Sequence, residues 1–146
     1  MPQKDFTHEK IVPIILCFVF CDGKLLLLKR SDAVPIYKNL WSQVSGFIDD
    51  EKTPEERVLT ELKEELRVKR GDVKNLQAVT VSTHVDEKIG KTWICHIYLA
   101  EIARPEITLN FEHSEYAWIK PEAARDYETA PGFEKELEAV LPFLRI

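Results

Sequence analysis

The chain has 146 residues, of which 45% are hydrophobic and 31% charged, the composition of one ordinary globular domain that would span residues 1–146. Its formal net charge of −5 gives no electrostatic case for a protein that binds nucleic-acid polymers or anionic membranes, because such proteins normally carry a basic surface. A phosphate-bearing ligand would therefore need local cations or a metal ion. The polar residues 1–10 and the short apolar run at 11–20 predict neither a signal peptide nor a membrane anchor.

The cysteines indicate a reducing environment. Cys17, Cys21 and Cys95 form no CxxC motif. An odd number of cysteines in a chain without a secretion signal is typical of buried, reduced thiols. We therefore expect no disulfide and a cytoplasmic location.

The first third of the chain predicts a hairpin, a loop and a short strand. Residues 11–20 are rich in β-branched and aromatic side chains, and the apolar character resumes in KLLLLKR (24–30) after an Asp-Gly turn. The next segment contains Pro35 and Asn39 and has no clear period, so it is expected to be a loop. It leads into a short strand predicted at 44–48.

A helix is predicted from Pro54 to about Arg67. Thr53 provides a capping hydroxyl, Pro54 stands at the first helical position, and Glu56 follows the cap by three residues. Apolar residues at 58, 59, 62 and 66 continue the pattern at helical spacing.

The second half predicts further strands at 76–83, 93–101 and 115–119, the first two forming a hairpin across the turn VDEKIGK. A last helix is expected at 133–141, with Pro142 ending it. Strands, helix, strands and helix in this order predict an α+β fold, with a mixed β-sheet packed between helices.

Three carboxylates on the first helix form a candidate site. Glu61 precedes Glu64 by three residues and Glu65 by four, so all three can converge on one side of the helix. Like charges at this spacing destabilise a helix unless a cation lies between them, and Mg²⁺ prefers such oxygen ligands. The alternative is a solvated acidic face whose partners are Lys63 and Arg67.

The longer pattern resembles the Nudix box, Gly-x5-Glu-x7-Arg-Glu-U-x-Glu-Glu-x-Gly-U, in which U is aliphatic. Gly46 stands at its first position, residues 61–65 (ELKEE) reproduce its core, and Val68 closes it. The segments KLLLLKR (24–30) and EHSEYAWIKPEAA (112–124) are also similar to the family, so the resemblance spans about residues 11–125. It implies the Nudix α/β/α sandwich.

The resemblance also implies a chemistry. Nudix enzymes use the glutamates of the box to bind Mg²⁺ or Mn²⁺ and hydrolyse a nucleoside diphosphate linked to another group X. By resemblance, the catalytic and metal-site residues are Glu61, Glu64 and Glu65, with a backbone carbonyl near Ser45 and Gly46 as a further ligand. An acid from a later loop commonly completes such sites, and the candidates are Glu112 first and Glu115 second, against the alternative of solvated loop acids.

Three positions depart from the box. Lys52 stands at the first Glu, Thr60 at the Arg and Arg67 at the second Gly. The family's Glu and Arg resemble a charge pair that braces the loop against the helix, and the joint loss of both partners leaves no unpaired charge. Glu51, Asp49 or Asp50 could substitute for the acid, and Arg57 could offer a new partner on the helix.

Other side chains are weaker candidates for substrate binding. Arg30 and Lys38, with Lys29, could contact phosphates, although each could equally be a solvated surface charge. Trp41 and Phe47, with Trp93, could stack on a base or simply fill the core. We expect His84, His96 and His113 to be structural or exposed, because their spacing is not that of a metal site.

The sequence therefore predicts a Mg²⁺-dependent hydrolase that acts on a small nucleotide-type substrate. A catalytically weak or inactive nucleotide-binding module of the same fold is the alternative, motivated by the three departures. An isopentenyl-diphosphate isomerase is a third reading, but that branch has a Cys where Ser45 stands. The group X, the general base and a possible homodimer stay open.

Overall fold

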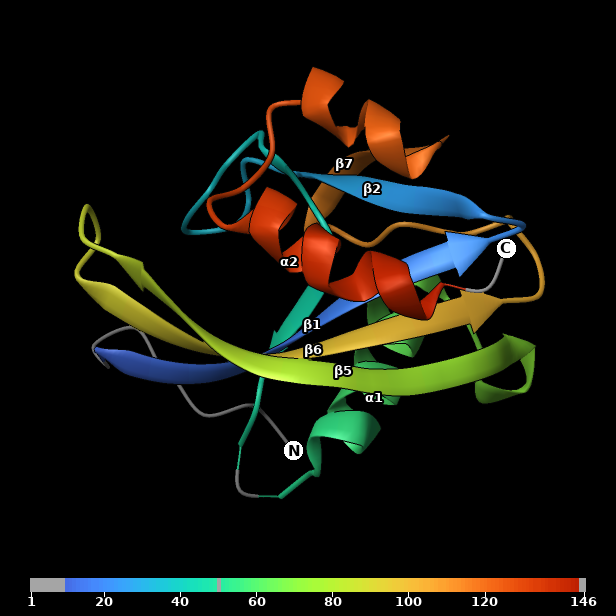
Figure 1. The fold of residues 1–146 in the computed structure, drawn as a ribbon, viewed down its shortest axis with the longest axis horizontal. Coiled ribbons are helices and arrows are strands. Elements are labelled where there is room, and N and C mark those ends of the chain that lie inside the picture. Colours follow the sequence, from blue (N-terminus) through green and yellow to red (C-terminus); the bar gives the residue numbers. More distant parts are fainter. Residues whose placement is uncertain (1–9, 50, 145–146) are drawn as a thin grey trace.

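The computed structural model describes residues 10–49 and 51–144. Within these residues, one mixed sheet contains the strands β1 (Ile11–Cys21), β2 (Lys24–Arg30), β3 (Trp41–Ser42), β4 (Val44–Phe47), β5 (Val73–Asp86), β6 (Lys91–Ile102) and β7 (His113–Ile119) (Figure 1). The helices are α1 (Pro54–Leu66), α2 (Phe133–Val140) and short 3₁₀ helices at Arg70–Asp72, Pro121–Asp126 and Leu141–Phe143. No helix in this part of the chain is long and apolar enough to cross a membrane.

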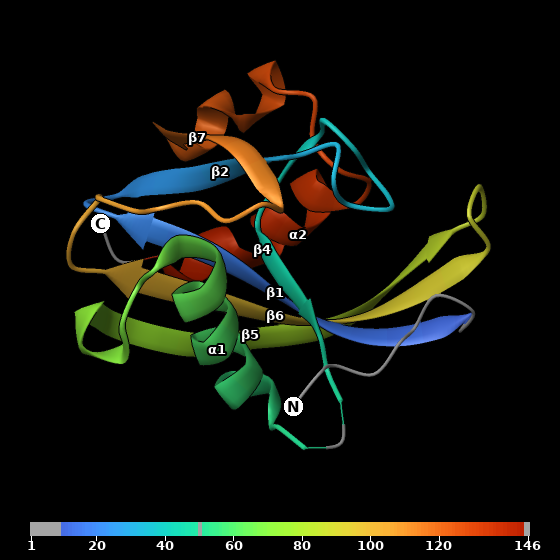
Figure 2. The same cartoon turned by 180° about the vertical axis from the view of Figure 1, so that it is seen from behind.

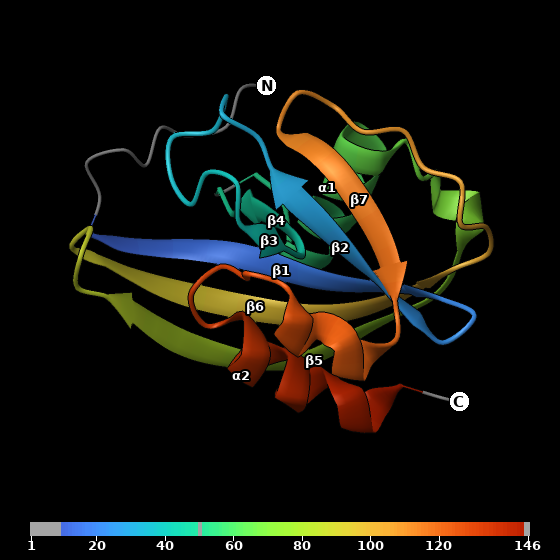
Figure 3. The ribbon, with the colours of Figure 1, turned by 90° about the horizontal axis from the view of Figure 1, so that it is seen from above.

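Strand β1 is the centre of the sheet. One of its edges pairs in parallel with β6 from Ile11 to Phe20. Its other edge is shared, because β4 pairs antiparallel with Ile14–Cys17 and β2 pairs antiparallel with Phe20 and Cys21. Strands β4 and β2 therefore diverge from the same edge, and Figure 3 shows β2 and β7 crossing β1 at an angle.

The two α-helices cover opposite faces of the sheet, α2 in Figure 1 and α1 in the reverse view of Figure 2. Alternation along β1 supplies both cores, since successive side chains of a strand point to opposite faces. Leu16, Phe18 and Phe20 pack with α2, whereas Ile15, Cys17 and Val19 pack with α1. The predicted mixed sheet between helices is confirmed.

Most predicted elements are confirmed, with differences at their ends. The β1–β2 hairpin is present, the strand predicted at 44–48 ends at Phe47, and the last helix ends at Val140 before a 3₁₀ turn that contains Pro142. Strands β5 and β6 are longer than predicted, 14 and 12 residues, because their tips pair beyond the buried region. The two-residue β3 and the 3₁₀ helices were missed, since such short elements show no period. All three cysteines are buried free thiols, as predicted.

Helix α1 is fixed by its caps and by one buried stripe. The Thr53 hydroxyl accepts a hydrogen bond from the Glu56 N–H (3.1 Å), and Val58, Leu62 and Leu66 are fully buried. The helix ends at Leu66 and is capped by Arg67, whose φ of 60° and ψ of 28° are left-handed. The Nudix box places Gly at this position, and Gly is the residue that adopts this conformation without strain.

We predict that Arg67→Gly stabilises the protein. A non-glycine residue in the left-handed region costs about 1–2 kcal/mol, whereas the flexibility of glycine in the unfolded chain costs about 0.5–1 kcal/mol, so the net gain should be about 0.5–1 kcal/mol. Urea unfolding measures it. The matched control is Lys69→Gly, which removes the same charge at an ordinary φ of −81° and should destabilise the protein. An unchanged or lower midpoint for Arg67→Gly would contradict the prediction.

Candidate active site

The acids of α1 differ in their surroundings. Glu61 and Glu65 are buried, with 5% and 1% of their surfaces exposed, whereas Glu64 is exposed. The alternative of a solvated acidic face therefore does not describe Glu61 and Glu65. Burial raises the pKa of the Glu61 carboxyl above its usual value, and Arg57 opposes this shift.

Glu61 lies directly against the backbone of β4 at Gly46. A Cβ atom added to Gly46 would stand 2.7 Å from both Cγ and Cδ of Glu61 and 2.9 Å from its Oε1. Side-chain carbon atoms do not approach one another this closely, so any residue larger than glycine would displace the Glu61 carboxylate. The glycine that opens the Nudix box is thus required here for space rather than for an unusual φ.

Glu65 is the most deeply placed acid of the site. Among the described residues neither of its carboxylate oxygens has a hydrogen-bond partner, and His113 Nδ1 lies 3.7 Å from Oε1. Burial, and then Glu61 and Glu112, raise the pKa of Glu65 well above its usual value. Burial and the charge of Arg30 lower the pKa of His113 to about 4, so His113 is neutral near pH 7 and supplies no compensating charge.

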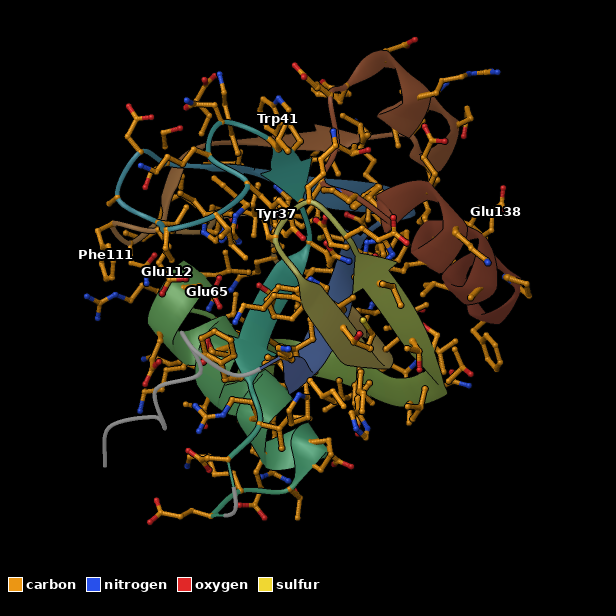
Figure 4. The ribbon with its side chains drawn as sticks, turned by 90° about the vertical axis from the view of Figure 1, so that its left-hand side faces the viewer. Tyr37, Trp41, Glu65, Phe111, Glu112 and Glu138 are labelled. Atoms are coloured by element: carbon orange, nitrogen blue, oxygen red, sulfur yellow. The ribbon has the colours of Figure 1, made fainter. Side chains whose placement is uncertain are left out.

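Glu112 approaches the same site from the loop before β7. Figure 4 shows Glu65 and Glu112 close together, with Phe111 beside them. Burial, and then Glu61, raise the pKa of Glu112, while Arg30 lowers it. Glu115, the second candidate, is instead exposed and pairs with Lys29 on β2 (3.4 Å). Of the two candidates, only Glu112 is on a loop and lies beside the helix carboxylates, whereas Glu115 is part of β7.

The donor set at this place suits a hard divalent cation. The buried Glu65 oxygens, which lack partners among the described residues, and the raised pKa values of Glu65 and Glu112 are what a cation would relieve, and carboxylates are the ligands that Mg²⁺ prefers. In the part of the chain that the structure describes, no group of three or more His, Cys, Asp or Glu side chains is arranged so that it could hold a metal ion by itself. Such a group is not needed, since Mg²⁺ usually takes one or two carboxylates together with substrate phosphates and waters.

The missing charge pair of the box is replaced by another. Arg57 is 4% exposed and donates to Asp49 Oδ2 (3.1 Å) and Glu61 Oε1 (3.4 Å). Lys52 is exposed, and the Thr60 hydroxyl donates to the Glu56 carbonyl (2.9 Å). The interpretation that Asp49 and Arg57 substitute for the lost pair is confirmed, whereas Asp50 lies outside the described residues.

A cavity of about 370 Å³ opens beside these carboxylates. This is within the range of small-molecule sites, about 300–1,000 Å³. At one end it is bordered by Arg30 at the end of β2, by Ser45 and Gly46 on β4, and by Glu61, Glu64 and Glu112. Apolar and aromatic side chains and a second set of polar side chains make up most of the remaining lining: Ile14, Leu16, Val34, Pro35, Ile36, Tyr37, Phe47, Trp93, Phe111, Gln43, His84, Cys95 and Glu136.

The predicted substrate-binding residues separate into two groups. Arg30 and Phe47 line the cavity, and Arg30 Nε donates to the Ile36 carbonyl (3.1 Å). Lys38 is exposed outside the cavity lining, and Trp41 packs edge-on against Tyr127, with ring centroids 5.1 Å apart.

Several lining residues were not found as functional candidates from the sequence. Tyr37, Gln43, Phe111 and Glu136 belong to a loop, a strand junction or a helix start without a periodic or motif signal. His113 could have been noticed, because it directly follows the candidate ligand Glu112.

The Arg57 pair allows a stability prediction. Removing one partner of a buried ion pair costs about 3–5 kcal/mol because the other charge stays buried, so Arg57→Leu and Asp49→Leu should each be strongly destabilising. The double variant should lose less than the sum of the two, as measured by a double-mutant cycle in urea. The control is Arg104→Leu, at an exposed pair with Asp72 (2.8 Å), which should cost less than about 1 kcal/mol. Additive effects of Arg57→Leu and Asp49→Leu would show that the pair is not coupled.

The chain is similar to proteins of one family. A family model described as NUDIX domain matches residues 10–140. The nucleoside triphosphatase NudI of Escherichia fergusonii is 32% identical over 126 residues, covering 80% of this chain and 86% of that protein. The solved NUDIX domain of Shewanella oneidensis NrtR, complexed with ADP ribose, has a TM-score of 0.77 at 17% identity and covers 98% of this chain and 94% of that one.

A second solved structure is similar in fold. It is a bifunctional NMN adenylyltransferase/ADP ribose pyrophosphatase from Francisella tularensis, complexed with AMP and an Mn ion, with a TM-score of 0.72 at 17% identity. The likeness covers 90% of this chain and 41% of that one. With the family model matched over most of its length, the chain belongs to the Nudix family and is a Nudix pyrophosphohydrolase, an enzyme of nucleotide-type small molecules.

Proposed function

We propose that this enzyme hydrolyses nucleoside triphosphates in a reaction that depends on Mg²⁺ or Mn²⁺, with Glu61, Glu64, Glu65 and Glu112 as the residues that hold the cation. The observation that carries the proposal is the buried Glu65 carboxylate beside Glu61 and Glu112, whose two oxygens lack hydrogen-bond partners in the described part of the chain. A backbone carbonyl near Ser45 and Gly46 is the proposed further ligand, because this segment borders the same end of the cavity.

The proposed substrate class is supported by the sequence similarity to a nucleoside triphosphatase and by the volume of the cavity. The name of the relative at 32% identity is nucleoside triphosphatase, whereas the solved structures compared above are only 17% identical and support the fold alone. A cavity of about 370 Å³ suits one nucleoside better than two. We therefore propose that one nucleoside enters the cavity and that the phosphates lie at the carboxylate end.

The residues of the chain have distinct proposed roles. A bound divalent cation supplies charge neutralisation of the phosphoryl oxygens and a lower pKa for the attacking water. Arg30 is the only lysine or arginine among the described residues that line the cavity, and it is the proposed phosphate contact. One carboxylate of the cluster accepts the proton of the attacking water, as general base.

A nucleotide-binding module without turnover is the competing function. The departures at 52, 60 and 67 motivate it. The Arg57–Asp49 pair favours the enzyme, because it restores a brace between the loop and α1 where the box has lost its own. Phosphate release from a panel of nucleoside triphosphates, with and without Mg²⁺, separates the two: binding without phosphate release would support the module. We also propose a cytoplasmic location, in keeping with three free thiols.

We predict that Glu65→Gln and Glu61→Gln each lower kcat by about 10²-fold or more, because an amide is a poor ligand for a hard cation. In the absence of divalent cations Glu65→Gln should unfold at a higher temperature than the unmodified protein, since one of several repelling carboxylates is gone. Glu61→Gln should not, because it also removes a buried partner of Arg57. Thermal unfolding by circular dichroism measures this. Glu138→Gln, at an exposed position of α2 away from the site and from the caps of α1, is the control and should change neither property. Near-normal hydrolysis by Glu65→Gln would place the cation elsewhere.

We further predict that Gly46→Ala lowers kcat by about tenfold or more, because the added Cβ atom would stand 2.7 Å from the Glu61 carboxyl carbon and displace it. Affinity for Mn²⁺, measured by titration calorimetry, should fall in parallel. Gly71→Ala is the control, since a Cβ atom there would meet nothing within 4 Å. Unchanged Mn²⁺ affinity in Gly46→Ala would mean that Glu61 does not hold the cation.

A further inference from the structure

A second buried acid lies at the end of the cavity away from the cation site. Glu136, in the first turn of α2, is 8% exposed and lines the cavity. Its Oε1 accepts a hydrogen bond from the Gln43 side-chain amide, at 3.1 Å. Gln43 is itself 4% exposed, so two polar side chains are held within an otherwise apolar region. Burying such groups is costly, and their presence calls for a role.

The surroundings of Glu136 come from three other elements. Gln43 lies between β3 and β4, Cys95 is on β6 and His84 is on β5. Gly132 leaves the necessary room, since a Cβ atom there would stand 3.2 Å from both Glu136 Oε2 and His84 Nδ1. His84 Nε2 is buried without a hydrogen-bond partner among the described residues. This end of the cavity therefore holds polar capacity that the protein alone leaves unused.

Aromatic side chains make the rest of this end suitable for a planar ring. Tyr37 and Trp93 line it, and the Trp93 indole N–H donates to the Tyr37 hydroxyl (3.2 Å). That hydroxyl in turn donates to Asp86 (2.6 Å), which fixes the orientation of both rings. A nucleobase has the flat apolar faces and polar edge that such a region binds.

The hydrogen-bonding capacity of the pair depends on one proton. A neutral Glu136 has both a hydrogen-bond donor and an acceptor, so it can pair with a base that presents a ring N–H and with a base that presents a bare ring nitrogen. An ionised Glu136 has only acceptors: it pairs with a ring N–H and repels the lone pair of a bare ring nitrogen. One Nε2 hydrogen of Gln43 is used by Glu136, and the other remains for a base carbonyl.

The carboxyl group is poised between these two states. Burial raises the pKa of Glu136 to about 7, while hydrogen bonds from Gln43 and Cys95 oppose the shift. Cys95 stays a neutral thiol near pH 7, because burial and Glu136 raise its pKa to about 12. His84 is the remaining titratable side chain facing Glu136 among the described lining residues.

We propose that the Gln43–Glu136 pair reads the edge of the nucleobase: a neutral Glu136 accepts all bases, whereas an ionised Glu136 favours bases with a ring N–H, such as uracil and guanine, over cytosine and adenine. The inference rests on the proposed function, since it assigns the base end of the same cavity. It makes Glu136 a specificity residue whose proton sets the preference for substrate.

The test is a competition between dUTP and dCTP, which differ only at this edge. Effects of pH on the chemical step are shared by both substrates and cancel in the ratio of their kcat/KM values. This ratio should rise by about tenfold between about pH 6 and about pH 8, because a carboxyl group that titrates near neutrality is mostly ionised one pH unit above its pKa. The pair dGTP and dATP should behave in the same way.

Variants identify the titrating group. Glu136→Gln keeps a donor and an acceptor at every pH, so its ratio should stay flat and near the low-pH value of the unmodified enzyme. Glu138→Gln, on the same helix but exposed and pointing outward in Figure 4, is the matched control and should keep the rise. His84→Gln should keep it too. A rise that persists in Glu136→Gln, or one that disappears in His84→Gln alone, would overturn the proposal.

A binding measurement separates the two levels of inference. Affinities for dUMP and dCMP can be measured in EDTA by calorimetry from about pH 6 to about pH 8, because binding needs neither catalysis nor a cation. The ratio of the dUMP affinity to the dCMP affinity should rise with pH as the ratio of kcat/KM values does. Hydrolysis of none of the nucleotides together with a pH-dependent binding ratio would refute the proposed function and support the base-reading pair. Hydrolysis with flat ratios in the unmodified enzyme would refute the pair alone, whether or not Glu136→Gln folds.

Discussion

The close approach of Glu61 to the backbone of β4 is the contact on which the site depends. It requires a glycine at 46, because a Cβ atom would lie within 3 Å of the carboxylate. It also requires α1 to hold its register against β1, which the fully buried Val58, Leu62 and Leu66 secure on the adjacent stripe of the helix. The same helix therefore packs one face into the core and presents acids on another. A shift of the apolar stripe would also move the acids.

Burial and neighbouring acids raise the pKa values of Glu65 and Glu112 at this junction, and two arginines partly offset the charge of the cluster. Arg57 is shared between Asp49 and Glu61, and Arg30 partly offsets Glu65 and Glu112. His113 is neutral and cannot help. Repulsion of this kind raises the electrostatic free energy of the folded protein, and a bound cation would lower it again. Functional sites commonly carry such a local cost in stability.

Much of the fold follows from local patterns in the sequence, and much of the site does not. The capping residues Thr53 and Pro54, the stripe of α1 and the β1–β2 hairpin are local signals, so they were predictable. The glutamates were found through a motif. The Arg57–Asp49 pair was only one of several substitutes suggested, since the choice between them depends on the path of a loop. Gln43 and Glu136 are 93 positions apart, and no local pattern reports a pairing set by the packing of α2 on the sheet.

The layered architecture explains why the cavity has two unlike acidic regions. Helix α1 and helix α2 cover opposite faces of the sheet, and the divergence of β4 and β2 from β1 opens a path between the two layers. Each helix thus contributes a buried carboxyl group to one cavity. Near α1, several acids and the charge of Arg30 suit phosphates and a cation. Near α2, a single acid among aromatic rings suits a neutral base. Because the two regions come from different elements, substitutions in the region near α2 could alter substrate preference without disturbing the carboxylates near α1.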